Sequence, residues 1–219
     1  MFDKTHSTDR SRRNYLKAVG GIATVGVAGL AGCTGASAQT VVRNETREEP
    51  IVTDDDLEVT EGAEVQNGIE TEGDVVVSNS DVAGGIRAEG DVQITNSTVD
   101  GGIWSEGDVS IGESDVLGDV QTEGDIESTD STVTGDVFAD GDIVLVESEI
   151  EGGVTADGDV QLTNSSVAGD VLADGDVTVE AESWVDGSVE ADGDILVSND
   201  SEIVGVIDAS DDYDEDDED

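Results

Sequence analysis

At 219 residues the chain has room for one domain plus short targeting segments, and it is extremely acidic, with 55 Asp and Glu against 8 Lys and Arg. Five of the basic residues and two of the acidic ones precede Cys33, so the remainder carries three arginines and 53 carboxylates. Phosphate binding requires clustered Lys and Arg, which excludes nucleic acid as a direct partner. The acidity fits either a disordered polyanion or a folded protein adapted to molar salt, and charge alone does not separate the two.

The N-terminal residues have the pattern of an export signal. Arg12 and Arg13 lie in a run, residues 11–17, that resembles the twin-arginine export motif, with Tyr15 where Phe is more usual. The apolar stretch that follows, residues 18–30, is shorter than the roughly 20 residues that span a bilayer, and it fits the apolar core of a signal peptide.

The apolar stretch ends in Leu-Ala-Gly-Cys33, which resembles a lipobox. The resemblance implies that Cys33 becomes the first mature residue and carries a lipid. We therefore expect residues 1–32 to be a twin-arginine lipoprotein signal peptide, and the body to be held on the extracytoplasmic face of the cell membrane. Two alternatives remain open: export by the general secretory route with an ordinary basic segment, and an uncleaved signal anchor in which Cys33 is simply a small residue.

Polar segments flank the central part of the chain. Residues 33–53 have little apolar pattern and are predicted to be a lipidated flexible tether. Residues 210–219 contain eight acidic residues in ten and are predicted to be a disordered acidic tail.

Residues 54–209 contain a repeat. A glycine followed by an aspartate and an aliphatic residue recurs with spacings of 17 six times and then 18, at Gly73, Gly90, Gly107, Gly124, Gly141, Gly158, Gly175 and Gly193. Aliphatic residues then alternate as in a β-strand, and two further apolar blocks follow in each period. We predict an all-β, single-stranded, right-handed parallel β-helix of about nine coils of 17–18 residues. The inward positions of its divergent first coil, residues 54–71, are Leu57, Val59, Val65 and Ile69.

The Gly-Asp-aliphatic corners and the 17-residue period resemble the bactofilin family of polymer-forming cytoskeletal proteins. The resemblance covers residues 54–209 and implies a right-handed triangular β-helix that assembles end to end into filaments. Bactofilins usually lie in the cytoplasm or on the inner membrane face, whereas this chain carries an export signal.

Equivalent residues of adjacent coils stack about 4.8 Å apart in such a fold. We expect a ladder of hydroxyl groups bonded to backbone along one corner, formed by Ser80, Ser97, Ser114, Ser131, Ser148, Ser165, Ser183 and Ser201. A catalytic serine would not be expected to occur eight times, and residues 54–209 contain no histidine to activate one.

The aspartates beside the glycines repel one another by roughly 0.9 kcal/mol per pair in water. Molar salt screens most of that repulsion, because the Debye length falls to about 3 Å.

Carboxylate columns also suggest a site for Ca²⁺ or Mg²⁺, and the candidate ligands are Asp91, Asp108, Asp125 and Asp142. The alternative is that these acids only keep the surface hydrated, and we expect no cofactor.

Asn-x-Ser/Thr sequons that permit glycosylation occur at Asn44, Asn96, Asn164 and Asn199. One outward column contains Arg87, Trp104, Phe138 and Leu172, and this thin apolar stripe is either a chance of surface composition or a lateral contact.

These patterns favour a structural or scaffolding surface lipoprotein of the cell envelope in a high-salt organism, anchored in the membrane by lipid and self-associating end to end. The alternative is an adhesin or a divalent-cation-binding display module. An enzyme acting on polysaccharide comes third, because the coil lengths vary by one residue and no His or Lys follows residue 17 for proton transfer.

Overall fold

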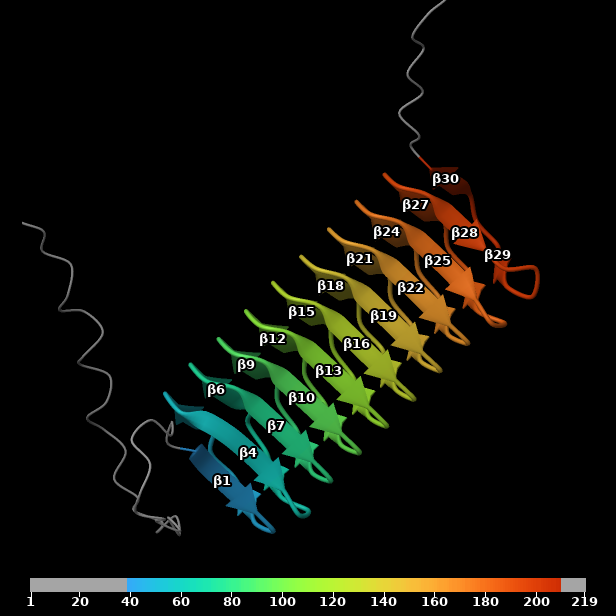
Figure 1. Cartoon of the computed structure of the whole chain (residues 1–219). Coiled ribbons are helices and arrows are strands. Elements are labelled where there is room, and N and C mark those ends of the chain that lie inside the picture. The colour runs from blue at the N-terminus through green and yellow to red at the C-terminus, as the bar shows by residue number, and fades with distance from the viewer. Residues whose placement is uncertain (1–38, 210–219) are drawn as a thin grey trace, which may run out of the picture. The chain divides into compact units, whose positions relative to one another are not determined.

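The computed structural model describes residues 39–209, which form one stack of coils (Figure 1). Within this range there are thirty strands and no helix. The strands form three parallel sheets of ten strands each, in which every strand except those of the first and last coils pairs with the equivalent strands of the preceding and following coils. The predicted all-β parallel solenoid is therefore confirmed.

The three sheets are named A, B and C in the order in which each coil enters them. Sheet A contains β1 (Gln39–Arg43), β4 (Asp56–Thr60), β7 (Val75–Ser78), β10 (Val92–Thr95), β13 (Val109–Gly112), β16 (Ile126–Thr129), β19 (Ile143–Val146), β22 (Val160–Thr163), β25 (Val177–Glu180) and β28 (Ile195–Val197). Sheet B contains β2 (Thr46–Arg47), β5 (Glu64–Val65), β8 (Asp81–Val82), β11 (Thr98–Val99), β14 (Asp115–Val116), β17 (Thr132–Val133), β20 (Glu149–Ile150), β23 (Ser166–Val167), β26 (Trp184–Val185) and β29 (Glu202–Ile203). Sheet C contains β3 (Ile51–Thr53), β6 (Ile69–Thr71), β9 (Ile86–Ala88), β12 (Ile103–Ser105), β15 (Val120–Thr122), β18 (Val137–Ala139), β21 (Val154–Ala156), β24 (Val171–Ala173), β27 (Val189–Ala191) and β30 (Ile207–Ala209).

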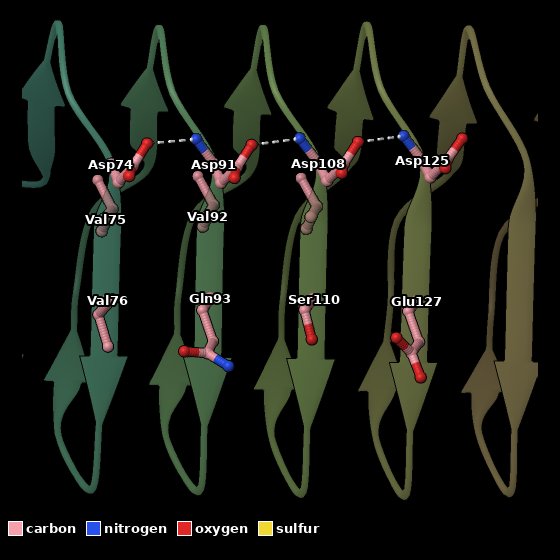
Figure 2. Close-up of a pocket in the computed structure, with 11 residues that line it drawn as sticks. Asp74, Val75, Val76, Asp91, Val92, Gln93, Asp108, Ser110, Asp125 and Glu127 are labelled. Carbon is pink, nitrogen blue, oxygen red and sulfur yellow. Dashed lines mark hydrogen bonds between the residues drawn. The ribbon is translucent and has the colours of Figure 1, made fainter.

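The coil is right-handed. In Figure 2 the strands of sheet A nearest the viewer run downward, from Asp74 through Val75 to Val76, while successive coils follow from left to right. The register between coils is regular, because Val92 pairs with Val109 and each equivalent pair in the central coils is 17 residues apart. Coils near the two ends are one residue longer, as in the pairing of Val177 with Ile195.

The core is a continuous set of apolar columns along the inside of the stack. In a typical coil Val92, Ile94, Val99 and Ile103 are at most 2% exposed. The expected inward residues Leu57, Val59, Val65 and Ile69 are also buried. β-Branched side chains suit these positions because their restricted χ1 rotamers cost little entropy in a strand, and because they pack well against their neighbours in the adjacent coils.

The solenoid begins earlier than the sequence analysis predicted. Residues 39–53, placed there in a flexible tether, form the strands β1, β2 and β3 of an additional coil, so the stack has ten coils instead of about nine. Val42 is 1% exposed and Ile51 packs against the core. No Gly-Asp corner precedes β1 or β4, which is why this additional coil was not recognised, although Asn44 has the same left-handed backbone as Asn79.

The corner between sheets A and B is a tight turn in every coil. In the first nine coils it contains a non-glycine residue of positive φ, namely Asn44, Glu61, Asn79, Asn96, Glu113, Asp130, Glu147 or Asn164, with Ala181 and Glu182 in the longer ninth coil. Short polar side chains tolerate this left-handed conformation better than β-branched ones do.

The expected serine ladder lies directly after this turn and is confirmed. Ser131 is 5% exposed, its hydroxyl donates to the carbonyl of Thr129 at 2.7 Å, and it accepts the N–H of Ser114 at 3.1 Å. Ser128 replaces an inward aliphatic residue and contacts the same ladder through the hydroxyl of Ser148 at 3.1 Å. Every buried side-chain oxygen or nitrogen in residues 39–209 has a hydrogen-bond partner. The hydroxyls therefore serve the backbone, which is a structural role.

Candidate functional site

The aspartates beside the glycine corners form a hydrogen-bonded ladder along one edge of sheet A (Figure 2). The Oδ1 atom of Asp74 accepts the backbone N–H of Asp91 at 3.0 Å, and Asp91 accepts that of Asp108 at 2.9 Å. The same contact recurs through Asp125, Asp142, Asp159, Asp176 and Asp194 at 2.8–3.0 Å. Hydrogen bonds to an ionised acceptor are stronger than those between neutral groups. The ladder therefore offsets part of the repulsion that its like charges create.

The glycine in each corner makes this contact sterically feasible. A Cβ atom at Gly124 would overlap Oδ1 of Asp108 and would lie 2.9 Å from the backbone of Gly107. A side chain at that position would therefore displace the carboxylate from the N–H of Asp125. The recurring Gly-Asp pair is consequently one structural unit, in which the glycine leaves space for the aspartate of the preceding coil.

A second carboxylate ladder lies at the corner between sheets B and C and was not anticipated from the sequence. Oδ1 of Asp119 accepts the N–H of Asp136 at 3.0 Å, and Oδ1 of Asp136 accepts that of Gly153 at 2.8 Å. Asp170 accepts the N–H of Ser188 at 2.7 Å in the same way. The Gly-Asp-Val triplet that ends in Val120 was the available signal, because it repeats the chemistry of the first corner.

A depression in the surface runs along the first ladder. It has a volume of about 500 Å³ and lies between the aspartates and the outward side chains of sheet A. Figure 2 shows those outward side chains as a mixed column of Val76, Gln93, Ser110 and Glu127. The depression is therefore an open groove lined by both polar and apolar groups, which suits a hydrated surface better than an enclosed ligand site.

Three of the four candidate cation ligands line this groove, but they do not converge on a point. Asp91, Asp108 and Asp125 stand one coil apart, with one oxygen of each engaged by the next backbone N–H, and Asp142 continues the series. Residues 39–209 contain no group of three or more His, Cys, Asp or Glu side chains arranged to hold a metal ion. The arrangement is a line of single carboxylates instead of a coordination sphere of the kind that Ca²⁺ requires.

The outward column predicted on sheet C is present. The register places Arg87 beside Trp104, and the guanidinium carbon lies 3.7 Å from the centroid of the indole ring. Phe138 and Leu172 follow at intervals of two coils and are 39% and 41% exposed. Gln121 and Thr155 stand between the apolar residues and interrupt the stripe. A guanidinium over an indole ring is attracted by the ring's quadrupole, which fixes the Arg87 side chain on this face.

The last described coil exposes apolar groups that are buried in every central coil. Ile195, Val197 and Ile203 are only partly buried, whereas the equivalent Val177, Val179 and Val185 are fully buried. Ile207, the equivalent of the buried Val189, is 52% exposed, and Val206 next to it is 67% exposed. At this end the apolar columns meet solvent, and the strands β28, β29 and β30 have a neighbour on one side only.

All four sequon asparagines lie at the corner between sheets A and B. Asn44 lies between β1 and β2, Asn96 between β10 and β11, Asn164 between β22 and β23, and Asn199 between β28 and β29, and all four are exposed. In Figure 1 these positions belong to the row of turns that follows the arrowheads of sheet A.

The targeting motifs, Arg12, Arg13 and Cys33, lie outside the described residues, as do the N-terminal part of the predicted tether and the acidic tail. Nothing in residues 39–209 is a helix long and apolar enough to cross a membrane.

Three stacked parallel sheets around one apolar core define the class of the described body, which is a β-solenoid. Comparison of the chain with protein families, with curated proteins and with solved structures finds no match. The similarity to bactofilins therefore remains a similarity of residue pattern.

Proposed function

We propose that this chain is a structural lipoprotein that displays a rigid, acidic β-solenoid on the extracytoplasmic face of a membrane in concentrated salt and assembles end to end. The twin-arginine and lipobox patterns at Arg12, Arg13 and Cys33 support the location. The net charge of −47 supports the high-salt setting, because such a charge destabilises a compact state unless ions screen it.

The observation that carries the assembly proposal is the state of the last coil. Ile195, Ile203 and Ile207 continue the core columns but are left partly open to solvent, beside strands with one free edge. An open parallel edge with an apolar core behind it is a template for another strand. The best-matched occupant is the first coil of a second copy, because β1, β2 and β3 present the same three-sided arrangement and the same strand direction.

Charge governs when this association can occur. Residues 210–219 add eight carboxylates next to β30, so an approaching acidic copy is repelled at low ionic strength. Rods are therefore expected to lengthen as salt rises, and the salt needed falls when residues 210–219 are removed.

The test is light scattering and electron microscopy of the mature chain across about 0.1 to 3 M KCl, a range over which the Debye length falls from about 10 Å to about 3 Å or less. Ile203→Asp places a charge at the open end of the core and should prevent lengthening. Leu117→Asp is the matched control, because it adds the same charge at a side chain that is 51% exposed in the middle of the stack. Monomers at every salt concentration, with or without residues 210–219, would reject the assembly.

A second candidate function is a binding module, and the outward column of sheet C favours it. Trp104 under Arg87, followed by Phe138 and Leu172, gives this face a column of partly exposed apolar groups beside a cation. If this face binds a partner, Phe138→Ser should abolish capture of the partner and leave the length of the rods unchanged. Loss of rod formation in that variant would instead make the face part of the assembly contact.

A further inference from the structure

Glycosylation sequons in this chain converge on a single edge of the solenoid. Five asparagines occupy the corner between sheets A and B, and four of them have a hydroxyl residue two positions later; these are Asn44, Asn96, Asn164 and Asn199. Taking about 4.8 Å per coil, Asn96 lies about 14 Å from Asn44 and about 19 Å from Asn164 along the stack. The acceptor nitrogens therefore form a row parallel to the axis.

Turn geometry explains the asparagines but not the complete sequon. Asn44, Asn96 and Asn164 have φ between 48° and 53°, a conformation that asparagine tolerates well, and Asn79 has the same conformation at 50°. After Asn44, Asn96 and Asn164 the third residue of the motif lies on the outward face of sheet B and takes no part in the turn. After Asn199 the third residue is Ser201, which belongs to the serine ladder. The third residue is Thr98 after Asn96 but Asp81 after Asn79, so position in the corner alone does not create the motif.

The acceptor side chains are accessible in the folded body. The four asparagines are exposed, and Thr98 and Ser166 are part-exposed on β11 and β23. The amide nitrogen of Asn96 donates to Oδ1 of Asn79 at 2.7 Å. Attachment of a sugar replaces one of the two amide hydrogens, and the other can keep this bond. Access in the folded state matters because the proposed twin-arginine route delivers folded cargo, so the inference rests on the proposed export.

We infer that this edge is an N-glycosylated edge, modified at Asn44, Asn96, Asn164 and Asn199. The donor is a lipid-phosphate-linked oligosaccharide of the extracytoplasmic face. The side-chain nitrogen forms a bond to the anomeric carbon, the bond from that carbon to the lipid phosphate oxygen breaks, and the amide proton leaves as the lipid phosphate is released.

The carbohydrate would cover one edge and leave the others bare. In a coil with three sides, the corner between sheets A and B lies opposite sheet C, which carries Arg87 and Trp104. The glycans therefore keep neighbouring rods apart on the A–B edge and direct any lateral contact to the opposite face. They also leave both ends of the stack free for association with further copies.

The test is glycopeptide mass spectrometry on the full chain, expressed in a salt-grown host that has an extracytoplasmic oligosaccharyltransferase. We expect carbohydrate on the four sequon asparagines and none on Asn79. Thr98→Ala should remove it from Asn96 alone, while Asp81→Ser, which completes a sequon after Asn79, should add a fifth glycan. Both substitutions are on the outward face of sheet B, so the fold is retained.

The outcomes separate this inference from the proposed function. Surface-exposed, lipidated protein without carbohydrate at any of the four positions overturns the inference and leaves the proposed function intact. Carbohydrate on Asn79 in the unaltered chain also overturns it, because the modification would then ignore the motif. A chain that remains inside the cell contradicts the proposed export and, with it, both conclusions.

Discussion

The Oδ1 atom of Asp108 accepts a hydrogen bond from the backbone N–H of Asp125 at 3.0 Å, so two residues whose charges repel each other are also bonded to each other. The attraction involves a backbone donor and depends on direct contact, whereas the repulsion acts between exposed charges and depends on salt. This difference allows the two effects to be separated by experiment.

Asp108→Asn retains an acceptor oxygen and removes the charge, whereas Asp108→Ala removes both. At low salt the Asn variant should gain stability relative to the natural chain by about 1 kcal/mol, and this gain should disappear in molar KCl. The Ala variant should be about 1 kcal/mol less stable than the Asn variant at every salt concentration, because the N–H of Asp125 loses its partner. Thermal unfolding at two salt concentrations measures both differences. Equal stability of the Asn and Ala variants would mean that the acceptor contributes nothing.

Val133→Asp tests the inward orientation of sheet B. Val133 is 1% exposed, so its replacement buries an unpaired charge and should lower the free energy of unfolding by several kcal/mol. Thr132→Asp is the control, because Thr132 pairs with Asp115 and Glu149 in the adjacent coils and acids are already accepted at that position. Similar thermal midpoints for the two variants in molar KCl would contradict the assignment of the inward face.

Two glycine substitutions test the corner geometry. A Cβ at Gly124 overlaps the carboxylate of Asp108, so Gly124→Ala should destabilise the stack by about 1–3 kcal/mol, the usual cost of overpacking. A Cβ at Gly112 meets no atom within 4 Å, so Gly112→Ala should be neutral or slightly stabilising through the entropy of the unfolded chain. Denaturant midpoints of both variants provide the measurement, and a Gly124→Ala protein as stable as Gly112→Ala would refute the steric argument.

Anchoring is tested at the motifs outside the described residues. Cys33→Ser should release the protein into the medium or leave it as an unprocessed precursor, detected by fractionation and mass. Replacing Arg12 and Arg13 together by Lys should block export if the route is twin-arginine. Arg10→Lys lies just before that motif and should have no effect. Processed, membrane-bound protein after Cys33→Ser would contradict lipidation at this residue.

Much of the fold could be predicted because the residue type at each position of the repeat indicates whether that position lies in a strand, in the core or in a corner. Alternating positions such as Val75 and Val77 indicate strands, and a period of 17 residues brings them into the same column. The first coil was missed because it shares the columns but lacks the glycine corner that marks the third and later coils. Val42 and Ile51 alone carry too little pattern to indicate a coil.

The hydrogen bonds of the two aspartate ladders could not be predicted from the sequence. The sequence places Asp91 next to Asp108 in a column, and from charge alone this arrangement is only repulsive. The compensating hydrogen bond depends on which backbone N–H points toward the carboxylate. The pattern of side chains in the sequence does not indicate the orientation of a backbone N–H at a corner. The second ladder, from Asp119 to Gly153, could have been found from the Gly-Asp-Val triplets, whereas its hydrogen bonds required the three-dimensional register.

The ladders connect each coil only to its immediate neighbours, and this has a consequence for how such a chain can change in length. Residues 91–107 form one complete period, and Asp74 makes to Asp91 the contact that Asp91 makes to Asp108. If those 17 residues were removed, Asp74 would lie one coil from Asp108 and could accept the backbone N–H of Asp108 in the same hydrogen bond. The gene can therefore lengthen or shorten the rod by in-frame duplication or loss of a 17-codon unit, in steps of about 4.8 Å, while the aspartate ladder stays continuous.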